Sequence, residues 1–366
     1  MRIAVITDAW HPQINGVVTT LSKTGEGLAA MGHEVLFVTP DNFRTIPCPT
    51  YPSIHLALNP AGKMERMLRA FAPHAVHIAT EGPLGWAARR YCRNHGLAFT
   101  TSYHTQFPQY VKLRVPVPMN WSYAVLRHFH GGAVRTMVPT PSLRRELRRQ
   151  RFSNVVIWPR GVDTELFRPA DKSFLDASRP IAMYAGRVAV EKNIEAFLSL
   201  DMPGSKYVVG DGPDLEKLRR KYPAVCFTGF KNHVELALYL AAADVFVFPS
   251  RTDTFGLVML EAMACGLPVA AFPVTGPVDV VRHGETGMLD ADLGKAVHGA
   301  LALDGRVCRD HALDRSWRQA TECFAGYLVD NREGFAQETE PDAYDSAQSA
   351  AAIFTSAGVV AEETRN

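Results

Sequence analysis

Short β-branched runs alternate with stretches of helical periodicity along most of the chain. In the first half, helical segments such as residues 19–32 and 84–96 separate the predicted strands. These strands are residues 2–8, 33–40, 75–80, 98–103, 136–140 and 154–159. Strands that alternate with helices are typical of βαβ units, whose strands lie parallel. The first half is therefore predicted to form an α/β domain around a doubly wound parallel sheet.

The same alternation starts again after residues 165–180, which have the composition of a linker. Further strands are predicted at residues 180–186, 205–210, 225–229, 245–250 and 268–272. We expect two Rossmann-like domains, residues 1–168 and 169–330, and an acidic, loosely ordered tail at 331–366. Open parallel sheets bind ligands at the carboxyl ends of their strands, so the two domains are expected to face a central cleft that holds the ligand.

The composition is that of an ordinary soluble protein, with 47% hydrophobic and 21% charged residues among 366. No signal peptide is expected, because the chain opens directly on a strand-like run. The longest apolar window, residues 237–249, is too short for a transmembrane helix and contains Asp244. The six cysteines are scattered without a C-x-x-C pair, which argues against a zinc site and a disulfide framework and favours a cytoplasmic setting.

Charge is unevenly distributed along the chain. Residues 1–170 have 20 Lys and Arg against 9 Asp and Glu, a net charge of +11, whereas residues 171–366 have 19 against 28, a net charge of −9. A basic half indicates an anionic partner, such as a membrane surface or a nucleic acid.

Two acids stand in an otherwise apolar stretch, RTDTFGLVMLEAMACGLPVA at residues 251–270. Asp253 follows a predicted strand and is expected at or near the N-cap of the next helix, with Glu261 two turns further in. An Asp in this place is most often only a cap, whereas a carboxylate on so apolar a helix face as that of Glu261 is seldom buried without a partner. A helix N-terminus also suits a phosphate or a sugar hydroxyl.

The span PSRTDTFGLVMLEAMACGLPV, residues 249–269, resembles the signature of the retaining glycosyltransferases of family 4, which have the GT-B fold and an E-x7-E motif. The resemblance implies that Glu261 binds the ribose hydroxyls of a nucleotide. It also implies that the first acid, here Asp253, contacts hydroxyls of the donor sugar. Asp253 stands where the family more often has Glu, and its shorter reach bears on which sugar is bound.

Further motifs of the same family follow in order. The resemblance implies that Arg187 and Lys192 in YAGRVAVEKN neutralise the donor diphosphate, and that glycines of GDGP and FTGF lie against the nucleotide. The WHPQINGVV segment has Asn15 before Gly16 where the family usually has two glycines, and Asn tolerates a positive φ. The implied donor-binding residues are Gly16, Arg187, Lys192, Gly210, Gly229, Asp253, Thr254, Phe255, Gly256, Leu257 and Glu261.

The segment SYHTQFPQY, residues 102–110, matches a family segment whose histidine points into the cleft. An isolated histidine is more often a core or surface residue, but its position at a strand end favours a functional role for His104. The implied catalytic residues are His104, Arg187, Lys192 and Asp253. The residues expected to bind the acceptor are Asn15, Tyr103 and Tyr110.

A basic amphipathic helix is predicted in PSLRRELRRQRF, residues 141–152, with Leu143 and Leu147 on one face. It is either a solvated helix or a membrane-binding one, and the basic first half favours the membrane. The arginines expected at an anionic membrane surface are Arg144, Arg145, Arg148, Arg149 and Arg151. Residues 115–129 add apolar surface for acyl chains, although core packing explains them nearly as well. Nucleic acid is not an expected partner, because no aromatic residues stand between the arginines.

We therefore expect a retaining glycosyltransferase that moves a hexose from a UDP- or GDP-linked sugar to a hydroxyl, with a membrane lipid such as diacylglycerol as acceptor. The enzyme is expected to be cytoplasmic and peripheral on the inner face of the cell membrane. No cofactor or essential metal is expected, since Asp290 and Asp292 alone make a poor metal site. A soluble or polysaccharide acceptor, a GT-B nucleotide-sugar epimerase and a non-catalytic nucleotide-binding module are the alternatives. A dinucleotide-dependent oxidoreductase lacks its G-x-G-x-x-G fingerprint here.

Overall fold

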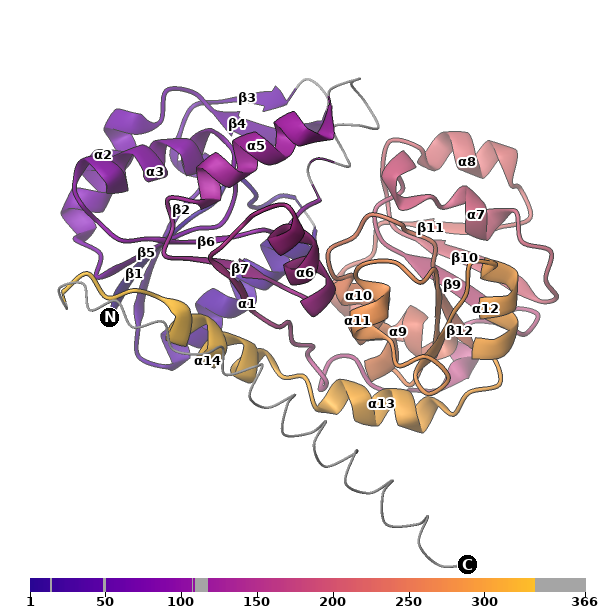
Figure 1. Cartoon of the computed structure of the whole chain (residues 1–366). Coiled ribbons are helices and arrows are strands. Elements are labelled where there is room, and N and C mark those ends of the chain that lie inside the picture. The colour runs from indigo at the N-terminus through magenta and orange to yellow at the C-terminus, as the bar shows by residue number, and fades with distance from the viewer. Residues whose placement is uncertain (14, 49–50, 107, 109–117, 333–366) are drawn as a thin grey trace, which may run out of the picture.

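Two six-stranded sheets, whose strands pair in parallel, form the centres of two domains in the computed structural model (Figure 1). The structure describes residues 1–13, 15–48, 51–106, 108 and 118–332. The first sheet has the order β2-β1-β5-β6-β7-β8. Its strands are β1 (Arg2–Ile6), β2 (Glu34–Val38), β5 (Ala75–Ile78), β6 (Thr100–Ser102), β7 (Arg135–Val138) and β8 (Val155–Ile157). Ile3 of β1 is in register with Val35 on one side and Ala75 on the other.

The second sheet has the order β11-β10-β9-β12-β13-β14. Its strands are β9 (Ile181–Ala185), β10 (Ser205–Val209), β11 (Cys226–Gly229), β12 (Val245–Phe248), β13 (Val269–Ala271) and β14 (Gly287–Leu289). The central strands β9 and β12 are buried along their whole length, because helices cover both faces. Met183 of β9 is in register with Tyr207 and Phe246. The predicted α/β architecture of two doubly wound parallel sheets is confirmed.

Helices connect consecutive strands in both domains. Those of the first half are α1 (Gly16–Ala30), α2 (Ala61–Phe71), α3 (Pro83–Asn94), α5 (Met119–His130) and α6 (Pro141–Arg149). Those of the second half are α7 (Glu195–Leu198), α8 (Leu215–Lys221), α9 (His233–Ala242), α10 (Leu257–Ala264), α11 (Pro277–Val280), α12 (Leu293–Ala300), α13 (Gly305–Leu313) and α14 (Trp317–Tyr327). Short 3-10 turns are η1 (Pro40–Asn42), η2 (Lys172–Phe174) and η3 (Val190–Lys192). No helix among the described residues is long and apolar enough to cross a membrane.

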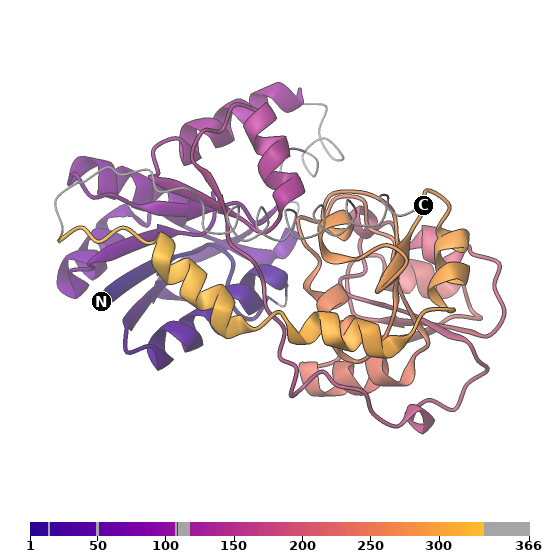
Figure 2. The same cartoon turned by 60° about the horizontal axis from the view of Figure 1, so that its bottom comes forward.

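Several elements have no counterpart among the predicted ones, including the sixth strand of the second sheet, β14. An antiparallel hairpin, β3 (Thr45–Cys48) and β4 (Tyr51–Ala57), follows β2. Helix α14 lies within the range expected for the second domain, 169–330, but it packs on the first domain (Figure 2). Phe324 joins the core around Val5 and Trp158, and the Trp158 indole donates a 3.0 Å hydrogen bond to the carbonyl of Ala320. The expected tail lies outside the described residues from position 333 on.

The chain therefore crosses between the domains twice, and the two crossings touch. The amide of Val162 donates a 3.0 Å hydrogen bond to the carbonyl of Arg315. A Cβ atom on Gly161 would lie only 2.3 Å from the backbone nitrogen of Trp317. Since real Cβ atoms do not approach backbone this closely, a residue without a side chain is required where the crossings meet.

Candidate functional site

Loops at the carboxyl ends of β6 and β12 meet between the domains. The hydroxyl of Thr254 donates a 2.7 Å hydrogen bond to the carbonyl of His104. The side-chain amide of Gln106 lies 3.4 Å from the carbonyl of Asp253. A Cβ atom on Gly16, at the start of α1, would lie 3.5 Å from a methyl carbon of Leu257. The structure thus brings residues expected at the donor site, from both halves of the sequence, to one place.

The loop before α10 differs from the expectation at its helix end. Gly256, with φ of 84°, is the N-cap of α10, and no side chain caps the helix. A Cβ atom at Gly256 would lie 2.8 Å from the Phe248 ring, so this left-handed turn is packed tightly against β12. The turn places Asp253 three residues before the cap, and the expectation that Asp253 caps this helix is wrong.

Asp253 instead forms an ion pair with Lys192 from the loop after β9. The Lys192 ammonium nitrogen lies 2.5 Å from Oδ1 of Asp253. Asn193, with φ of 52°, follows η3. Its side-chain amide donates a 3.0 Å hydrogen bond to the carbonyl of Pro249, which holds the loop after β9 against the loop after β12. Oδ2 of Asp253 is buried and has no hydrogen-bond partner among the described residues. A buried carboxylate oxygen without a donor is costly, so Oδ2 is suited to accept a ligand hydroxyl.

Arg187 lies on the same loop as Lys192. It follows β9 and is partly buried, and its backbone is held by a 2.8 Å hydrogen bond from the Tyr184 hydroxyl to the Arg187 carbonyl. Both cations follow the same strand, β9, and two cations on one strand-end loop suit a diphosphate, which needs charge-assisted donors. Their joint role at the diphosphate stays a prediction.

Gly210 is required by contact between strand ends. Its φ is 141°, and a Cβ atom there would lie 1.9 Å from the carbonyl oxygen of Gly186. Its amide donates a 2.9 Å hydrogen bond to the carbonyl of Gly229, whose own φ is 72°. Gly210 was expected because a nucleotide would approach its backbone closely. The structure shows instead that the loop containing Gly186 approaches it, which by itself requires a glycine.

Glu261 lies just past the first turn of α10, on a helix whose neighbouring residues Leu260 and Ala262 are buried. Burial raises the pKa of the Glu261 carboxyl from 4.5 to about 7. Desolvation disfavours the charged form, so near neutral pH the carboxyl is divided between its two protonation states. Such a group ionises more fully when hydroxyl donors bind it, which fits the expected contact with a ribose.

His104 is an uncharged hydrogen-bond donor in this structure. Its Nδ1 accepts from Nη2 of Arg160 at 3.4 Å, and its ring meets Trp158 edge-on at 5.8 Å. Burial, together with the nearby Arg160 charge, holds the pKa of His104 well below its usual 6.5. Because a guanidinium only donates, the proton of the neutral ring lies on Nε2. Nε2 is buried and has no partner among the described residues, which leaves an N–H group for a ligand oxygen.

Arg160, which the sequence analysis missed, holds His104 in this state. It is buried, stacks 4.1 Å above the Trp158 ring and donates to the carbonyls of Trp158 at 2.7 Å and Pro159 at 3.2 Å. Burial lowers the pKa of Arg160 to about 9. Its position directly after predicted strand 154–159 was the available signal, since strand ends supply ligand-binding residues.

Two of the three residues expected to bind the acceptor have structural roles instead. Tyr103 is wrong for this role, because its side chain is buried in the core beside Leu126 and Val138. Asn15 has φ of −157°, not the positive value that was considered, and its Oδ1 caps α1 by accepting from the amides of Val17 and Val18. Tyr110 lies outside the described residues.

Other expected positions are divided between core and surface. Phe255 is buried in the second domain, so only its main chain is available to a donor. Arg144 is also buried, because α6 packs its Leu143 and Leu147 face into the first domain. The expectation that Arg144 contacts a membrane is therefore wrong. The other four arginines expected at the membrane are exposed, namely Arg145, Arg148, Arg149 and Arg151. Asp292 is the N-cap of α12, and no group of metal-ligating side chains gathers among the described residues.

Comparison with known proteins decides the family. Residues 14–166 match the family described as Glycosyltransferase Family 4, and residues 179–302 match the one described as Glycosyl transferases group 1. The chain is 32% identical over 315 residues to a GDP-mannose-dependent alpha-mannosyltransferase of Mycobacterium tuberculosis, covering 79% of this chain and 83% of the relative. The chain belongs to glycosyltransferase family 4. The resemblance inferred from the TDTFG segment and its companions is confirmed.

Two further similarities support this glycosyltransferase assignment. The chain is 28% identical over 317 residues to an alpha-monoglucosyldiacylglycerol synthase of Acholeplasma laidlawii, covering 74% of this chain and 79% of the relative. The solved structure of sucrose-phosphate synthase from Thermosynechococcus elongatus superimposes with a TM-score of 0.74 at 25% identity, covering 89% of this chain and 97% of that one. The protein is therefore a glycosyltransferase with the GT-B fold.

Proposed function

We propose that this glycosyltransferase transfers a hexose from a nucleotide diphosphate sugar to a hydroxyl of a membrane lipid, with retention of the anomeric configuration. The observation that carries the proposal is the Lys192–Asp253 ion pair at the carboxyl edge of the second sheet. It places a cation suited to a diphosphate next to a carboxylate oxygen, Oδ2, that has no partner among the described residues. The His104 loop contacts the same segment from the first domain.

Each candidate residue binds a different part of the donor. Glu261 accepts from the ribose hydroxyls, Arg187 and Lys192 bind the diphosphate, and Asp253 accepts from a sugar hydroxyl through Oδ2. His104 donates its Nε2 proton in a hydrogen bond to an oxygen of the sugar. These roles need no metal, because the two cations supply the charge that stabilises the leaving group.

The proposed reaction takes place on one face of the sugar. The bond from the anomeric carbon to the phosphate oxygen breaks, and the departing nucleoside diphosphate is stabilised by Arg187 and Lys192. A phosphate oxygen takes the proton of the acceptor hydroxyl, and the hydroxyl oxygen bonds to the anomeric carbon on the side from which the phosphate leaves. The products are a nucleoside diphosphate and a glycoside with the configuration of the donor.

The lipid acceptor is supported by relatives and by charge. One relative is named an alpha-monoglucosyldiacylglycerol synthase, and the first 170 residues, with a net charge of +11, suit an anionic membrane. The proposed location is the inner face of the cell membrane, where the protein binds peripherally. Relatives named GDP-mannose-dependent support a guanine nucleotide and mannose as the first donor to try.

The test offers labelled GDP-mannose and UDP-glucose separately to the purified protein, with a lipid extract or with soluble sugars. Label that moves into the lipid phase from one donor, in the donor's anomeric configuration, is the expected result. Label on soluble sugars alone would overturn the lipid acceptor. A changed free sugar without a glycoside would indicate an epimerase, and binding of donor without turnover would indicate a nucleotide-binding module. Undiminished transfer in EDTA is expected if the two cations suffice.

A further inference from the structure

Helix α5 presents an apolar face to solvent on the first domain. Trp121 is 73% exposed and Val125 is 56% exposed, four residues apart on the same side of the helix. The opposite side of α5 is used by the core, where Tyr123, Leu126 and Phe129 are buried. Core packing therefore explains one side of this segment and leaves the Trp121 side unexplained.

Helix α3 continues this apolar face. Trp86 is 36% exposed and stacks on His128 of α5, with ring centres 6.0 Å apart and planes within 18°. Its edge contact with Phe129, at 5.0 Å, fixes it beside α5. Neither α3 nor α5 contains an aspartate or a glutamate. We call the surface of Trp86, Trp121 and Val125 the α3–α5 ridge.

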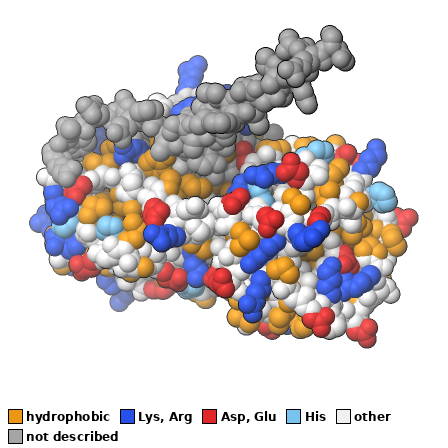
Figure 3. All heavy atoms as spheres, turned by 90° about the horizontal axis from the view of Figure 1, so that it is seen from below, with side chains coloured by type: hydrophobic (Ala, Val, Ile, Leu, Met, Phe, Trp, Pro, Cys, Tyr) orange, Lys and Arg blue, Asp and Glu red, His pale blue; other side chains and the backbone are white. Residues whose placement is uncertain are grey.

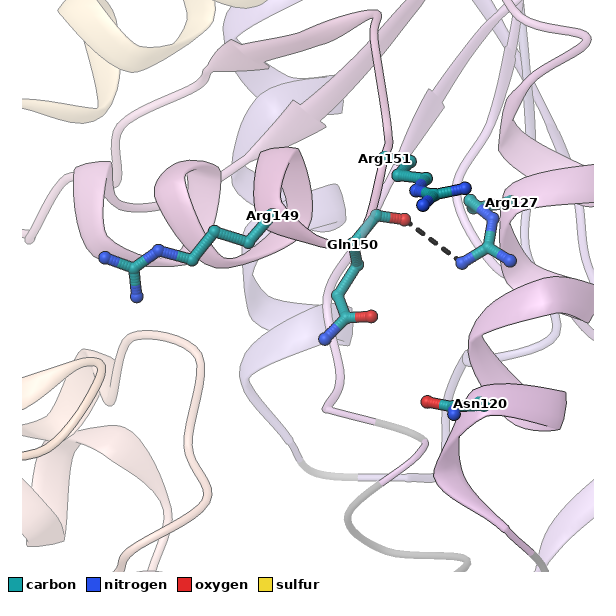
Figure 4. Close-up of a pocket in the computed structure, with 5 residues that line it drawn as sticks. All are labelled: Asn120, Arg127, Arg149, Gln150 and Arg151. Atoms are coloured by element: carbon teal, nitrogen blue, oxygen red, sulfur yellow. Dashed lines mark hydrogen bonds between the residues drawn. The ribbon is translucent and has the colours of Figure 1, made fainter.

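Arginines lie on both sides of the ridge. A hollow of about 320 Å³ on one side is lined by Asn120, Arg127, Arg149, Gln150 and Arg151 (Figure 4). A second hollow of about 460 Å³ is lined by Trp86, Arg89, Arg90, Arg93 and Asn94. With 3.6 residues per turn, Arg127 and Asn120 fall at one border of the exposed face of α5, Val125 at the other, and Trp121 between them.

The first hollow is suited to an anion. The Arg127 and Arg151 side chains lie next to one another, and Arg127 donates a 3.1 Å hydrogen bond to the carbonyl of Gln150 (Figure 4). None of the described residues that line the two hollows has a carboxylate. Neighbouring guanidinium groups repel one another, and a phosphate between them would relieve this repulsion.

We propose that the α3–α5 ridge is the surface on which the protein rests on an anionic phospholipid bilayer. Trp86, Trp121 and Val125 enter the headgroup region, and the arginines of the two hollows other than the buried Arg89 bind lipid phosphates. Exposed aromatic residues flanked by arginines have the chemistry of an interfacial site. On the face at the bottom of Figure 1, by contrast, basic and acidic side chains are interspersed (Figure 3). The inference rests on the lipid acceptor of the proposed function. It moves the apolar part of the membrane contact from α6, whose apolar face is buried, to α3 and α5, and keeps Arg149 at the end of α6 as one of the phosphate-binding arginines.

The test is sedimentation of the full chain with vesicles of phosphatidylcholine, with and without phosphatidylglycerol. We expect binding only to the anionic vesicles, and at least a tenfold loss of binding in the double variant Trp121→Ser/Val125→Ser. Arg90→Gln and Arg93→Gln are each expected to weaken binding about fivefold, which corresponds to the contribution of one basic residue near a membrane. The matched control is Val234→Ser/Leu238→Ser on α9, an apolar pair of the same spacing that is 62% and 41% exposed. This control should bind like the wild type.

A second measurement separates this inference from the proposed function. Transfer to acceptor lipid dispersed in detergent should be unchanged in the Trp121→Ser/Val125→Ser variant, because the cleft is intact and no bilayer is needed. If the wild type transfers to no lipid but still binds anionic vesicles through the ridge, only the proposed function fails. Equal vesicle binding by wild type and ridge variant, or an equal loss in the α9 control, would overturn the ridge as the membrane surface.

Discussion

The hydroxyl of Thr254 donates a 2.7 Å hydrogen bond across the domain boundary to the carbonyl of His104. It joins the segment that contains Asp253 to the segment that contains His104, the candidate histidine donor of the site. The Thr140 hydroxyl lies 3.5 Å from the carbonyl of Thr254, so the loop is contacted by the first domain at a second point.

Thr254→Val should therefore lower kcat/KM by about five- to tenfold, because a hydrogen bond worth about 1 kcal/mol is lost and the part-buried carbonyl of His104 loses its donor. Steady-state kinetics with varied donor measure this effect. Thr252→Val is the matched control, since its hydroxyl bonds at 3.3 Å to the Glu191 carbonyl within the second domain. Equal losses in the two variants would contradict a special role for the contact between domains.

Lys192→Ala should lose mainly turnover, by about 10²- to 10³-fold, because the leaving diphosphate loses a charged donor. Asp253→Ala removes the partner at 2.5 Å as well as the sugar contact, so the two losses should be less than additive in a double-mutant cycle. Lys221→Ala, which breaks an exposed 2.7 Å ion pair with Glu195, is the control and should be close to wild type. Mild, equal effects of Lys192→Ala and Lys221→Ala would count against the diphosphate role.

Glu261→Gln should make the protein more stable at alkaline pH. The carboxyl has a pKa of about 7 in the folded state against 4.5 when solvated, so the native state binds more protons between these values. Stability of the wild type therefore falls as the pH rises through this window, by up to about 3 kcal/mol, and the glutamine variant lacks this fall. Thermal melting of both proteins across the window measures it. Parallel melting curves at all pH values would show that the carboxyl is not buried.

The same substitution should weaken donor binding. Ribose hydroxyls donate to the ionised carboxylate, so wild-type donor affinity should decrease as the pH falls below about 7, by at most tenfold per pH unit. Glu261→Gln should bind donor more weakly and without this pH dependence, with a smaller effect on kcat. Calorimetric titration with the nucleoside diphosphate checks it, and Glu195→Gln on the surface is the control.

Arg160→Met should change the protonated nitrogen of His104. Without the guanidinium, Nδ1 loses its donor, and the ring is free to carry its proton on either nitrogen. Nitrogen NMR of the imidazole should show Nδ1 unprotonated in the wild type and partly protonated in Arg160→Met, with kcat reduced about tenfold. Arg160→Lys should restore part of both. A wild-type tautomer in Arg160→Met would show that Arg160 serves packing alone.

Much of the fold followed from local patterns, because buried parallel strands and the helices between them leave apolar runs of characteristic length. The errors have physical causes. The left-handed turn at Gly256 moves Asp253 away from the helix end, and nothing in the spacing predicts this. Tyr103 directly precedes His104, and because side chains of extended backbone alternate between two sides, Tyr103 faces the core and is unavailable to an acceptor. The burial of Arg144 depends on which face α6 packs against the domain.

Other parts of the site could not be predicted from local sequence patterns, because they depend on contacts between residues far apart in the chain. The Lys192–Asp253 pair joins residues 61 positions apart, so the sequence could supply both charges but not their contact. Arg160 and His104 belong to different strand ends, and their hydrogen bond depends on the order of strands in the sheet. The return of α14 to the first domain depends on long-range packing of Phe324. The amphipathic spacing of a helix shows that one face is buried, but not against which domain.

The contact of the two crossings at Gly161 determines how the halves of this enzyme can be exchanged or moved. The two chain segments that pass between the domains are held together by the Val162–Arg315 hydrogen bond, so we expect the cleft to open by rotation of the domains about that point. A chimera that takes its donor-binding half from a relative must keep residues 317–332 with the first half. A cut after residue 168 would separate the first sheet from the helix that completes its core.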